Sequence, residues 1–301
     1  MKNLKILAIL LSALLISCNN ESQKPIKVKL RDDANIQDKE QKNVTNTLRI
    51  LIAPVISPKE SMILYHQFVD YLWEKTNMEM TQILKKNYAE ANEAIKNQQC
   101  DIALICTGAY VLSKKELPVE ILVIPVVKKK IVYNSYIIAN INSNIEIFDD
   151  LEGKTFAFTD PLSLTGYHYV RHLLWAKKTN TNNYFKSTIY TNSHDISIEA
   201  VAQGIVDVAS IDSLIYDDLK DKKNPYVLKT KIIKVSEDFG IPPILIRKDL
   251  DIKIKNKIRN ILLGMHNDPK GREILKKLSI DSFTVGNEKI YESAEKILIL
   301  K

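Results

Sequence analysis

The sequence predicts a two-lobed α/β protein, with one mixed sheet in each lobe and two extended segments that cross between the lobes. Its 301 residues are enough for about two domains of roughly 150 residues each. The composition, 45% hydrophobic and 26% charged, is that of a folded chain. A stretch at 93–105 also recurs at 199–211, which indicates a duplicated α/β unit.

The first eighteen residues predict an export signal that ends at a cysteine. Lys2 and Lys5 precede an apolar run at 6–16, and Ser17 is followed by Cys18. A run of about 11 residues is too short to span a bilayer and is typical of a signal peptide. The order Leu-Ile-Ser-Cys resembles a bacterial lipobox, so we expect a signal peptide at 1–17 and a palmitate-type lipid anchor on Cys18. An ordinary signal peptide with a chance cysteine is the alternative.

The segment 18–47 is predicted to be a lipid-anchored flexible tether, because Asn, Gln, Lys, Asp and Glu dominate it. The folded part should begin at Leu48. The net charge of +7 is spread along the chain rather than gathered in one arm, which does not favour nucleic acid as a partner.

The recurrence has a single offset of 106 residues. EAIKNQQCDIALI at 93–105 aligns without gaps on EAVAQGIVDVASI at 199–211. The same offset carries Ser57 onto Ser163, Asn87 onto Ser193, Thr107 onto Ser213 and Tyr110 onto Tyr216. Two similar units at about 48–110 and 154–216 follow.

Each unit is predicted as βαβαβ. The first strands are expected at 48–53 and 155–159, the second at 78–84 and 187–190, and the third at 102–105 and 206–210. Ser57 and Glu60 form a capping-box pattern with Pro58 at the first helical position. The second helices should begin near Asn87 and Ser193. Parallel strands joined by helices place helix N-termini along one ligand-binding edge.

The remaining segments define the lobes. Further strands are expected at 119–127, 131–139, 227–235 and 243–247, and helices near 250–266, 268–277 and 288–298. The chain should cross near 138 and return near 240. Lobe 1 is then 48–137 plus 241–301, lobe 2 is 138–240, and the two form a hinged clamp.

Several common sites are excluded by the sequence. The eight glycines form no GxGxxG or Walker loop, the five histidines no HExxH and the three cysteines no CxxC. We therefore expect no cofactor. Cys100 and Cys106 flank a predicted strand, so their Cα atoms should be roughly 20 Å apart and the thiols unpaired.

Five strings resemble the phosphonate/phosphite/phosphate-binding proteins of ABC importers. They are GKTFAFTDP at 153–161, SLTGY at 163–167, HDISIEAV at 194–201, GIVDVASID at 204–212 and IPP at 241–243. The resemblance runs from about Leu48 to the C-terminus and implies a type II periplasmic-binding-protein-like fold. It departs at Leu162, Leu164 and Val55-Ile56, where relatives often carry small polar or aromatic residues. The mouth is then more apolar, which leaves a ligand of another class open.

The resemblance places an oxyanion on Ser163, Thr165 and His194. Helix N-termini offer free N–H groups and about half a positive charge, so an anion can be held there without arginine. His194 could donate from its ring and gain charge when the anion binds. The opposite wall is expected from Ser57, Tyr88, Thr107 and Tyr110, with Asp212 as a further ligand-binding candidate. The structural alternatives are a helix cap for Ser163 and Asp212, a surface imidazole for His194 and a packing aromatic for Tyr88.

The resemblance implies an extracytoplasmic substrate-binding component, not an enzyme. Its partners would be a small oxyanion of phosphonate, phosphite or phosphate type, a permease with its ATPase, and the bilayer through Cys18. A sensor or adhesion lipoprotein on the same fold is the first alternative. A hydrolase would need Ser163, His194 and Asp212 as a triad, without a GxSxG elbow. A metal protein would use His168 and His172, which lack a third ligand in the sequence.

Overall fold

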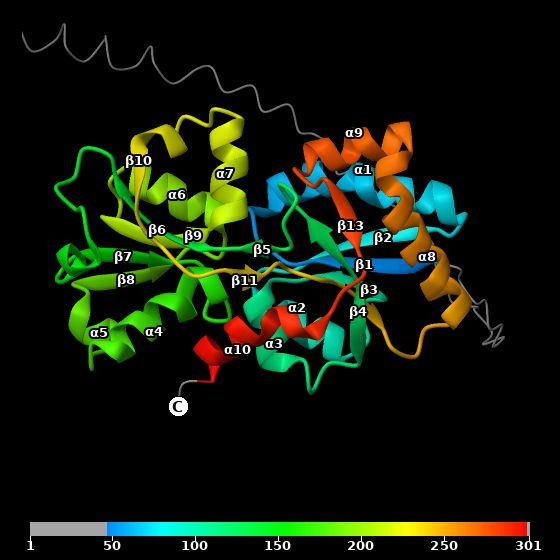
Figure 1. The fold of residues 1–301 in the computed structure, drawn as a ribbon, viewed down its shortest axis with the longest axis horizontal. Helices are drawn as coiled ribbons and strands as arrows, with labels where there is room; N and C mark the ends of the chain where they lie inside the picture. The colour runs from blue at the N-terminus through cyan, green and yellow to red at the C-terminus, as the bar shows by residue number, and fades with distance from the viewer. Residues whose placement is uncertain (1–46, 300–301) are drawn as a thin grey trace, which may run out of the picture. The chain divides into compact units, whose positions relative to one another are not determined.

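Two mixed sheets, each covered by helices on both faces, form the folded part of the chain (Figure 1). The computed structural model describes residues 47–299, so the predicted signal peptide, Cys18 and nearly all of the tether lie outside the described residues. Residues 47–299 belong to one compact unit. The described helices include none that is long and apolar enough to cross a membrane.

The six-stranded sheet and its helices are called lobe 1. Its strand order is β13-β4-β12-β3-β1-β2. The strands are β1 (Leu48–Ile52), β2 (Met80–Leu84), β3 (Ile102–Leu104), β4 (Val119–Val126), β12 (Ile244–Arg247) and β13 (Ser282–Thr284). β1 lies parallel to β2 and β3, whereas β12 runs antiparallel to both β3 and β4.

The five-stranded sheet and its helices are called lobe 2, with the order β10-β6-β9-β7-β8. Its strands are β6 (Ser135–Asn140), β7 (Thr155–Phe158), β8 (Ser187–Tyr190), β9 (Val208–Asp212) and β10 (Thr230–Val235). β7 is parallel to β8 and β9, and β6 is antiparallel to β9. The two crossing segments pair as a small antiparallel ribbon of β5 (Val132–Tyr133) and β11 (Phe239–Gly240).

Helices cover both faces of each sheet. In lobe 1, α1 (Pro58–Thr76), α8 (Ile252–Gly264) and α9 (Pro269–Lys277) share one apolar core, and α2 (Tyr88–Lys96) and α3 (Thr107–Ser113) share the other. In lobe 2, α4 (Tyr169–Ala176) and α5 (Thr181–Tyr184) lie opposite α6 (His194–Ala202) and α7 (Ser213–Asp221). The central strands of each sheet are therefore buried on both faces, whereas the edge strands β8 and β10 of lobe 2 are partly exposed.

The duplication predicted from the sequence is confirmed in the topology. The offset of 106 maps α2 onto α6 residue for residue, and it carries the start of β3 onto the start of β9 and the start of α3 onto the start of α7. Each sheet contains the same parallel trio with an antiparallel strand beside it. Because parallel strands end at one edge, the starts of α2 and α6 lie where ligands bind in such sheets.

The segments that join the lobes differ in detail from the expectation. The strand expected at 131–139 is divided into β5 and β6, so residue 138 lies inside β6 and the first crossing falls at β5. The C-terminal helix α10 (Glu292–Leu298) was assigned to lobe 1, yet Ala294, Ile297 and Leu298 pack in a core cluster of lobe 2. Tyr291, just before it, packs in lobe 1, so this helix bridges both lobes.

The capping box predicted at Ser57 is wrong. Pro58 does occupy the first turn of α1, but the Ser57 side chain makes no capping hydrogen bond. Instead the Ser57 amide donates to both carboxylate oxygens of Asp195 in lobe 2, at 2.9 and 3.1 Å. Asp195 of lobe 2 thus takes the place that the capping box gives to Glu60, as the acceptor of the Ser57 amide. Sequence spacing cannot reveal this exchange.

Gly108 lets the two lobes approach closely. A Cβ atom at this position in α3 would lie 2.3 Å from the Leu162 carbonyl oxygen and 2.5 Å from the Leu164 amide nitrogen of lobe 2. Both contacts are with backbone, so a rotamer change could not relieve them.

We expect Gly108→Ala to prevent the observed approach of the lobes while leaving each lobe folded. Small-angle scattering of the ligand-free protein should show a larger radius of gyration than the wild type. Gly264→Ala is the control, because no atom lies within 4 Å of the added Cβ there. An unchanged scattering profile for Gly108→Ala would contradict this role.

Candidate functional site

The helix starts at the edge of each sheet make hydrogen bonds across the two lobes. The amide of Tyr88, the first residue of α2, donates to Asp160 Oδ2 at 2.9 Å. The amide of His194, the first residue of α6, donates to the Val55 carbonyl at 3.0 Å. With the Ser57–Asp195 pair, three amides that precede or open helices are thus satisfied by the opposite lobe.

Asp160 behaves as an internal anion at this interface. Its carboxylate is 1% exposed and accepts from the amides of Tyr88 and Leu162, the latter at 2.8 Å. Burial raises the pKa of Asp160, while the two amide hydrogen bonds act in the opposite direction. A carboxylate at a helix N-terminus has the same chemistry as a bound oxyanion.

Ser163 and Thr165 lie in the turn after β7, both 1% exposed. Ser163 Oγ accepts from the Gly166 amide at 2.9 Å and caps the π-helical turn η2 (Leu164–His168). The hydroxyl hydrogen of Ser163 is therefore free to donate elsewhere. The Thr165 carbonyl accepts from the hydroxyls of Ser135 and Ser210, at 2.7 and 2.6 Å, which ties the turn to the sheet.

His194 is a buried, neutral ring rather than a surface imidazole. Its Nδ1 accepts from the Asp212 amide at 3.0 Å and lies 3.1 Å from Thr159 Oγ1. Because a backbone amide can only donate, Nδ1 carries no proton and Nε2–H is the donor. Burial lowers the pKa of His194 to about 3, so the ring is neutral in the ligand-free protein.

Two buried hydroxyls beside these helix starts have no hydrogen-bond partner among residues 47–299. They belong to Tyr88 at the start of α2 and Ser193 at the N-cap of α6. Burial, together with the nearby Cys106 and Asp160, raises the pKa of Tyr88 well above its ordinary value, so its hydroxyl keeps its proton. Unsatisfied buried hydroxyls cost free energy, which a polar ligand would recover.

Three lobe 1 candidates have other partners. Thr107 Oγ1 donates to the Gly240 carbonyl at 2.8 Å and ties α3 to the second crossing segment. Tyr110 donates to Glu288 and packs edge-on against Tyr291. Ser57 contributes its amide to Asp195. Ser163 and Thr165 thus lie in the turn after β7, and Tyr88 and His194 open α2 and α6. The side chains of Thr107 and Tyr110, by contrast, make internal hydrogen bonds.

Asp212 connects the helix starts to a cavity. Its carboxylate caps α7 by accepting from the Leu214 amide at 2.7 Å, as the structural alternative supposed. It is 3% exposed, and burial raises its pKa to about 7. Its side chain also lines a cavity of about 290 Å³ between the lobes. The carboxylate that caps α7 therefore also faces this cavity.

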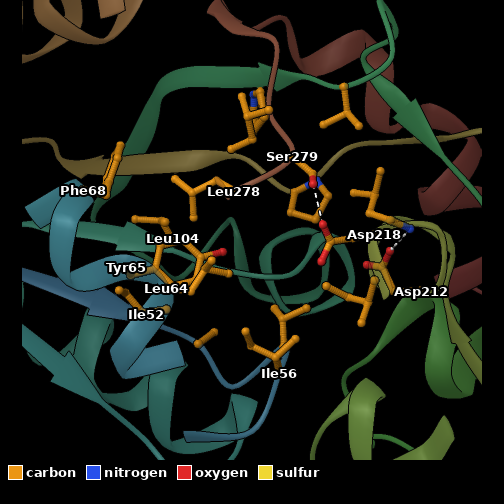
Figure 2. A pocket seen from close by; sticks show the side chains of 18 of the residues that line it. Ile52, Ile56, Leu64, Tyr65, Phe68, Leu104, Asp212, Asp218, Leu278 and Ser279 are labelled. Atoms are coloured by element: carbon orange, nitrogen blue, oxygen red, sulfur yellow. Dashed lines mark hydrogen bonds between the residues drawn. The ribbon is translucent and has the colours of Figure 1, made fainter. Parts of the chain in front are cut away.

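The cavity between the lobes is mostly apolar (Figure 2). Ile52, Leu64, Phe68 and Leu104 lie on one side, and the carboxylates of Asp212 and Asp218 lie on the other. None of Ser163, Thr165, His194 and Tyr88 lines it. This inter-lobe cavity therefore adjoins the predicted oxyanion site without coinciding with it.

The alternative chemistries have the following geometry. Cys100 and Cys106 are buried and unpaired. His168 and His172 line a separate pocket of about 240 Å³ beside α10, and no group of three or more potential metal ligands occurs within residues 47–299. His194 Nδ1 faces the Asp212 amide, not its carboxylate, so the arrangement differs from a Ser-His-Asp relay.

Sequence reasoning missed two of the functional contacts. Asp160 and Asp195 were within the quoted motifs, but their role as cross-lobe acceptors was not recognised. The signal available was an acidic residue directly after a strand and another in the first turn of a helix. The apolar wall that α1 contributes, which includes Leu64 and Phe68, was not foreseen from the sequence.

Comparisons with known proteins agree on one family. A family model described as "ABC transporter, phosphonate, periplasmic substrate-binding protein" matches residues 50–291. The phosphonates-binding periplasmic protein of Escherichia coli K12 is 29% identical over 160 residues, which is 52% of this chain and 47% of that relative. The match thus spans about half the length of that curated relative.

Solved structures show the same fold. A binding protein component of an ABC phosphonate transporter from Pseudomonas aeruginosa has a TM-score of 0.78 at 22% identity, covering 83% of this chain and 85% of the other. PhnD1 from Prochlorococcus marinus, in complex with methylphosphonate, has a TM-score of 0.75 at 16% identity, covering 84% and 97%. Both confirm the predicted two-lobed α/β clamp.

The buried carboxyl of Asp212 predicts a stability change with pH. Its pKa is about 7 in the folded protein against 3.8 ordinarily, so the folded state holds the extra proton between these values. Stability should therefore fall as pH rises from about 4 to about 7, at up to about 1.4 kcal/mol per pH unit. Asp212→Asn keeps an oxygen for the cap and should remove this loss.

Thermal unfolding at pH 4 to 8 measures the effect. Asp212→Asn should raise the melting temperature at pH 7.5 and have little effect near pH 4. Asp251→Asn is the matched control, because Asp251 caps α8 by accepting from Lys253 at the same 2.7 Å but is exposed. Equal shifts in both variants at all pH values would contradict the assignment.

Proposed function

Because this chain belongs to the family of phosphonate-binding periplasmic proteins of ABC transporters, we propose that it captures a phosphonate-type oxyanion between its lobes and delivers it to a membrane permease. Members of this family are extracytoplasmic substrate-binding proteins, not enzymes. The ligand of this chain, its permease with the cognate ATPase and its membrane anchor are parts of the proposal.

The observation that carries the proposal is the unsatisfied polar interface at the helix starts. The Tyr88 and Ser193 hydroxyls are buried without partners among the described residues. The Ser163 hydroxyl and the His194 Nε2–H keep a donor beyond their internal bonds. A small oxyanion has several acceptor lone pairs, so it could accept hydrogen bonds from these hydroxyl and imidazole donors.

The cross-lobe carboxylates suggest how the anion would enter. Asp160 holds the amide at the start of α2, and Asp195 holds the amide before α1. When the lobes separate at the crossing segments, both amides lose these acceptors and become available to a ligand. The anion would then replace the carboxylates of Asp160 and Asp195 as acceptors of these amides. Such a site needs no arginine, because the helix amides themselves bind the anion.

His194 would act as a neutral donor in this site. With a pKa of about 3 in the ligand-free protein, it contributes a hydrogen bond and no charge between pH 6 and 8. Nδ1 is held by the Asp212 amide, which orients the ring and keeps the proton on Nε2.

Membrane tethering through Cys18 is the second part of the proposal. The basic-apolar start followed by Leu-Ile-Ser-Cys supports lipidation at Cys18, and the polar segment after it would give the clamp reach from the bilayer to a permease. A sensor on the same fold would have the same anchor but no permease partner.

The oxyanion site is tested by removing its hydroxyls. Ser163→Ala and Thr165→Val should each weaken phosphonate binding by about 1–3 kcal/mol, or roughly five- to 150-fold in Kd, the range for hydrogen bonds to charged groups. Calorimetry against phosphate, phosphite and methylphosphonate measures this.

A matched control separates ligand binding from helix capping. Asn180→Ala removes an equivalent cap, since Asn180 accepts from the Asn183 amide at 3.0 Å in lobe 2. It should lower stability without changing affinity. If no oxyanion in the panel binds the wild type, or if Ser163→Ala and Asn180→Ala behave alike in affinity, the proposed site is wrong.

The anchor is tested by Cys18→Ala, which should move the protein from the membrane fraction to the soluble fraction, because the acceptor of the lipid is lost. Ser17→Ala keeps both the cysteine and a small residue before it, and should remain in the membrane. Retention of Cys18→Ala in membranes would refute lipidation at this position.

A further inference from the structure

The inter-lobe cavity has a wall of branched and aromatic side chains from both lobes. Figure 2 shows Ile52, Ile56, Leu64 and Leu104 around it. Lobe 2 contributes Leu214, Ile215 and Leu219 from α7. Its volume of about 290 Å³ is near the lower bound of pockets that bury small organic molecules, which are mostly apolar with a few polar groups.

The charged groups of the cavity are almost all acidic. Glu60, Asp195, Asp212 and Asp218 line it, against the single cation Lys222. Lys222 Nζ lies 2.8 Å from Asp218 Oδ2, and Ser279 also donates to Asp218. Asp195 is satisfied by the Ser57 amide. The one lining cation is therefore already paired with Asp218. An anionic group in this space would face the carboxylates of Glu60 and Asp195, and that of Asp212 when it is ionised.

The cavity and the proposed oxyanion site are joined by residues that line the cavity and bond to His194. Asp212 lines it with its side chain while its amide holds His194. Val55 lines it while its carbonyl accepts from the His194 amide. Asp195, the residue after His194, lines it as well. A molecule whose oxyanion lies at the start of α6 can thus extend its substituent into the apolar space.

Hydroxyl donors are also scarce at the mouth. Leu162 and Leu164 surround Ser163, and Val55 and Ile56 follow β1. Ile56 and Val55 both line the cavity. The apolar wall therefore extends to the β1–α1 connection through Val55 and Ile56, whereas Leu162 and Leu164 lie outside the cavity lining.

We propose that this protein selects phosphonates that carry an apolar organic substituent, which the inter-lobe cavity buries, over inorganic oxyanions and over phosphonates with a second anionic group. The selectivity-determining side chains are Ile56 and Ile63 of lobe 1 and Ile215 of lobe 2. The inference rests on the proposed function, since the oxyanion is assumed to sit at the helix starts.

Calorimetry with a ligand series tests the substituent. The series is phosphite, methylphosphonate, n-propylphosphonate, n-hexylphosphonate and 3-phosphonopropionate, measured with the full chain. Burial of each methylene contributes about 0.8 kcal/mol, so affinity should rise about fourfold per methylene until the cavity is filled. 3-Phosphonopropionate should bind at least about tenfold more weakly than n-propylphosphonate, because its carboxylate meets the acidic side of the cavity.

Two wall variants and a matched control locate the effect. Ile63 and Ile205 are each 63% exposed, but only Ile63 lines the cavity. Ile63→Asn and Ile56→Asn should each weaken n-hexylphosphonate binding by about fivefold or more and leave methylphosphonate binding unchanged. Ile205→Asn should change neither, and all three should retain a cooperative melting transition.

The outcomes separate this inference from the proposed function. A rise in affinity with chain length that is lost in Ile63→Asn supports it. Equal affinity for methyl, propyl and hexyl compounds, or equal binding of 3-phosphonopropionate and n-propylphosphonate, overturns it while the proposed function stands. Failure of methylphosphonate and of every longer compound to bind would overturn both.

Discussion

Helix starts carry amide groups that need acceptors, and in this protein the acceptors come from the opposite lobe. Asp160 serves the start of α2, Asp195 serves the residue before α1, and the Val55 carbonyl serves the start of α6. Everything else at the interface depends on this requirement, because buried amides cannot remain unpaired at low cost. The lobes are held together by the same groups that would hold a ligand.

The duplication explains why these groups face one another. Two copies of one βαβαβ unit place equivalent helix starts at equivalent strand ends, and the offset of 106 relates Tyr88 to His194. The copies then diverged in side chain. Lobe 2 contributes Ser163, Thr165 and a neutral imidazole, whereas lobe 1 contributes a tyrosine hydroxyl without a partner among the described residues. Similar backbones therefore present different chemistry on the two sides of the interface.

Polarity is also divided along the interface. The donors lie at the starts of α2 and α6, and the apolar wall lies beside α1 and α7. Asp212 stands at the boundary, where its amide orients His194 and its buried carboxyl caps α7. A site with donors at one end and hydrocarbon at the other favours amphipathic ligands, since each end recovers the desolvation cost of a different part of the molecule.

The fold class, the duplicated units and the helix starts at Asn87 and Ser193 could be predicted from the sequence, because apolar periodicity, capping residues and a constant offset are local or additive signals. It also located Ser163, Thr165 and His194 at strand ends. It could not show that Ser57 would leave its capping box for Asp195, that Thr107 and Tyr110 would bond elsewhere, or that His194 would be buried and neutral. The partners of Ser57, Thr107 and Tyr110 are more than 100 residues away in the sequence, and the His194 ring is neutral because water is excluded from it. Which partner a polar group meets, and in what dielectric, depends on the packing of distant segments, which local sequence signals do not encode.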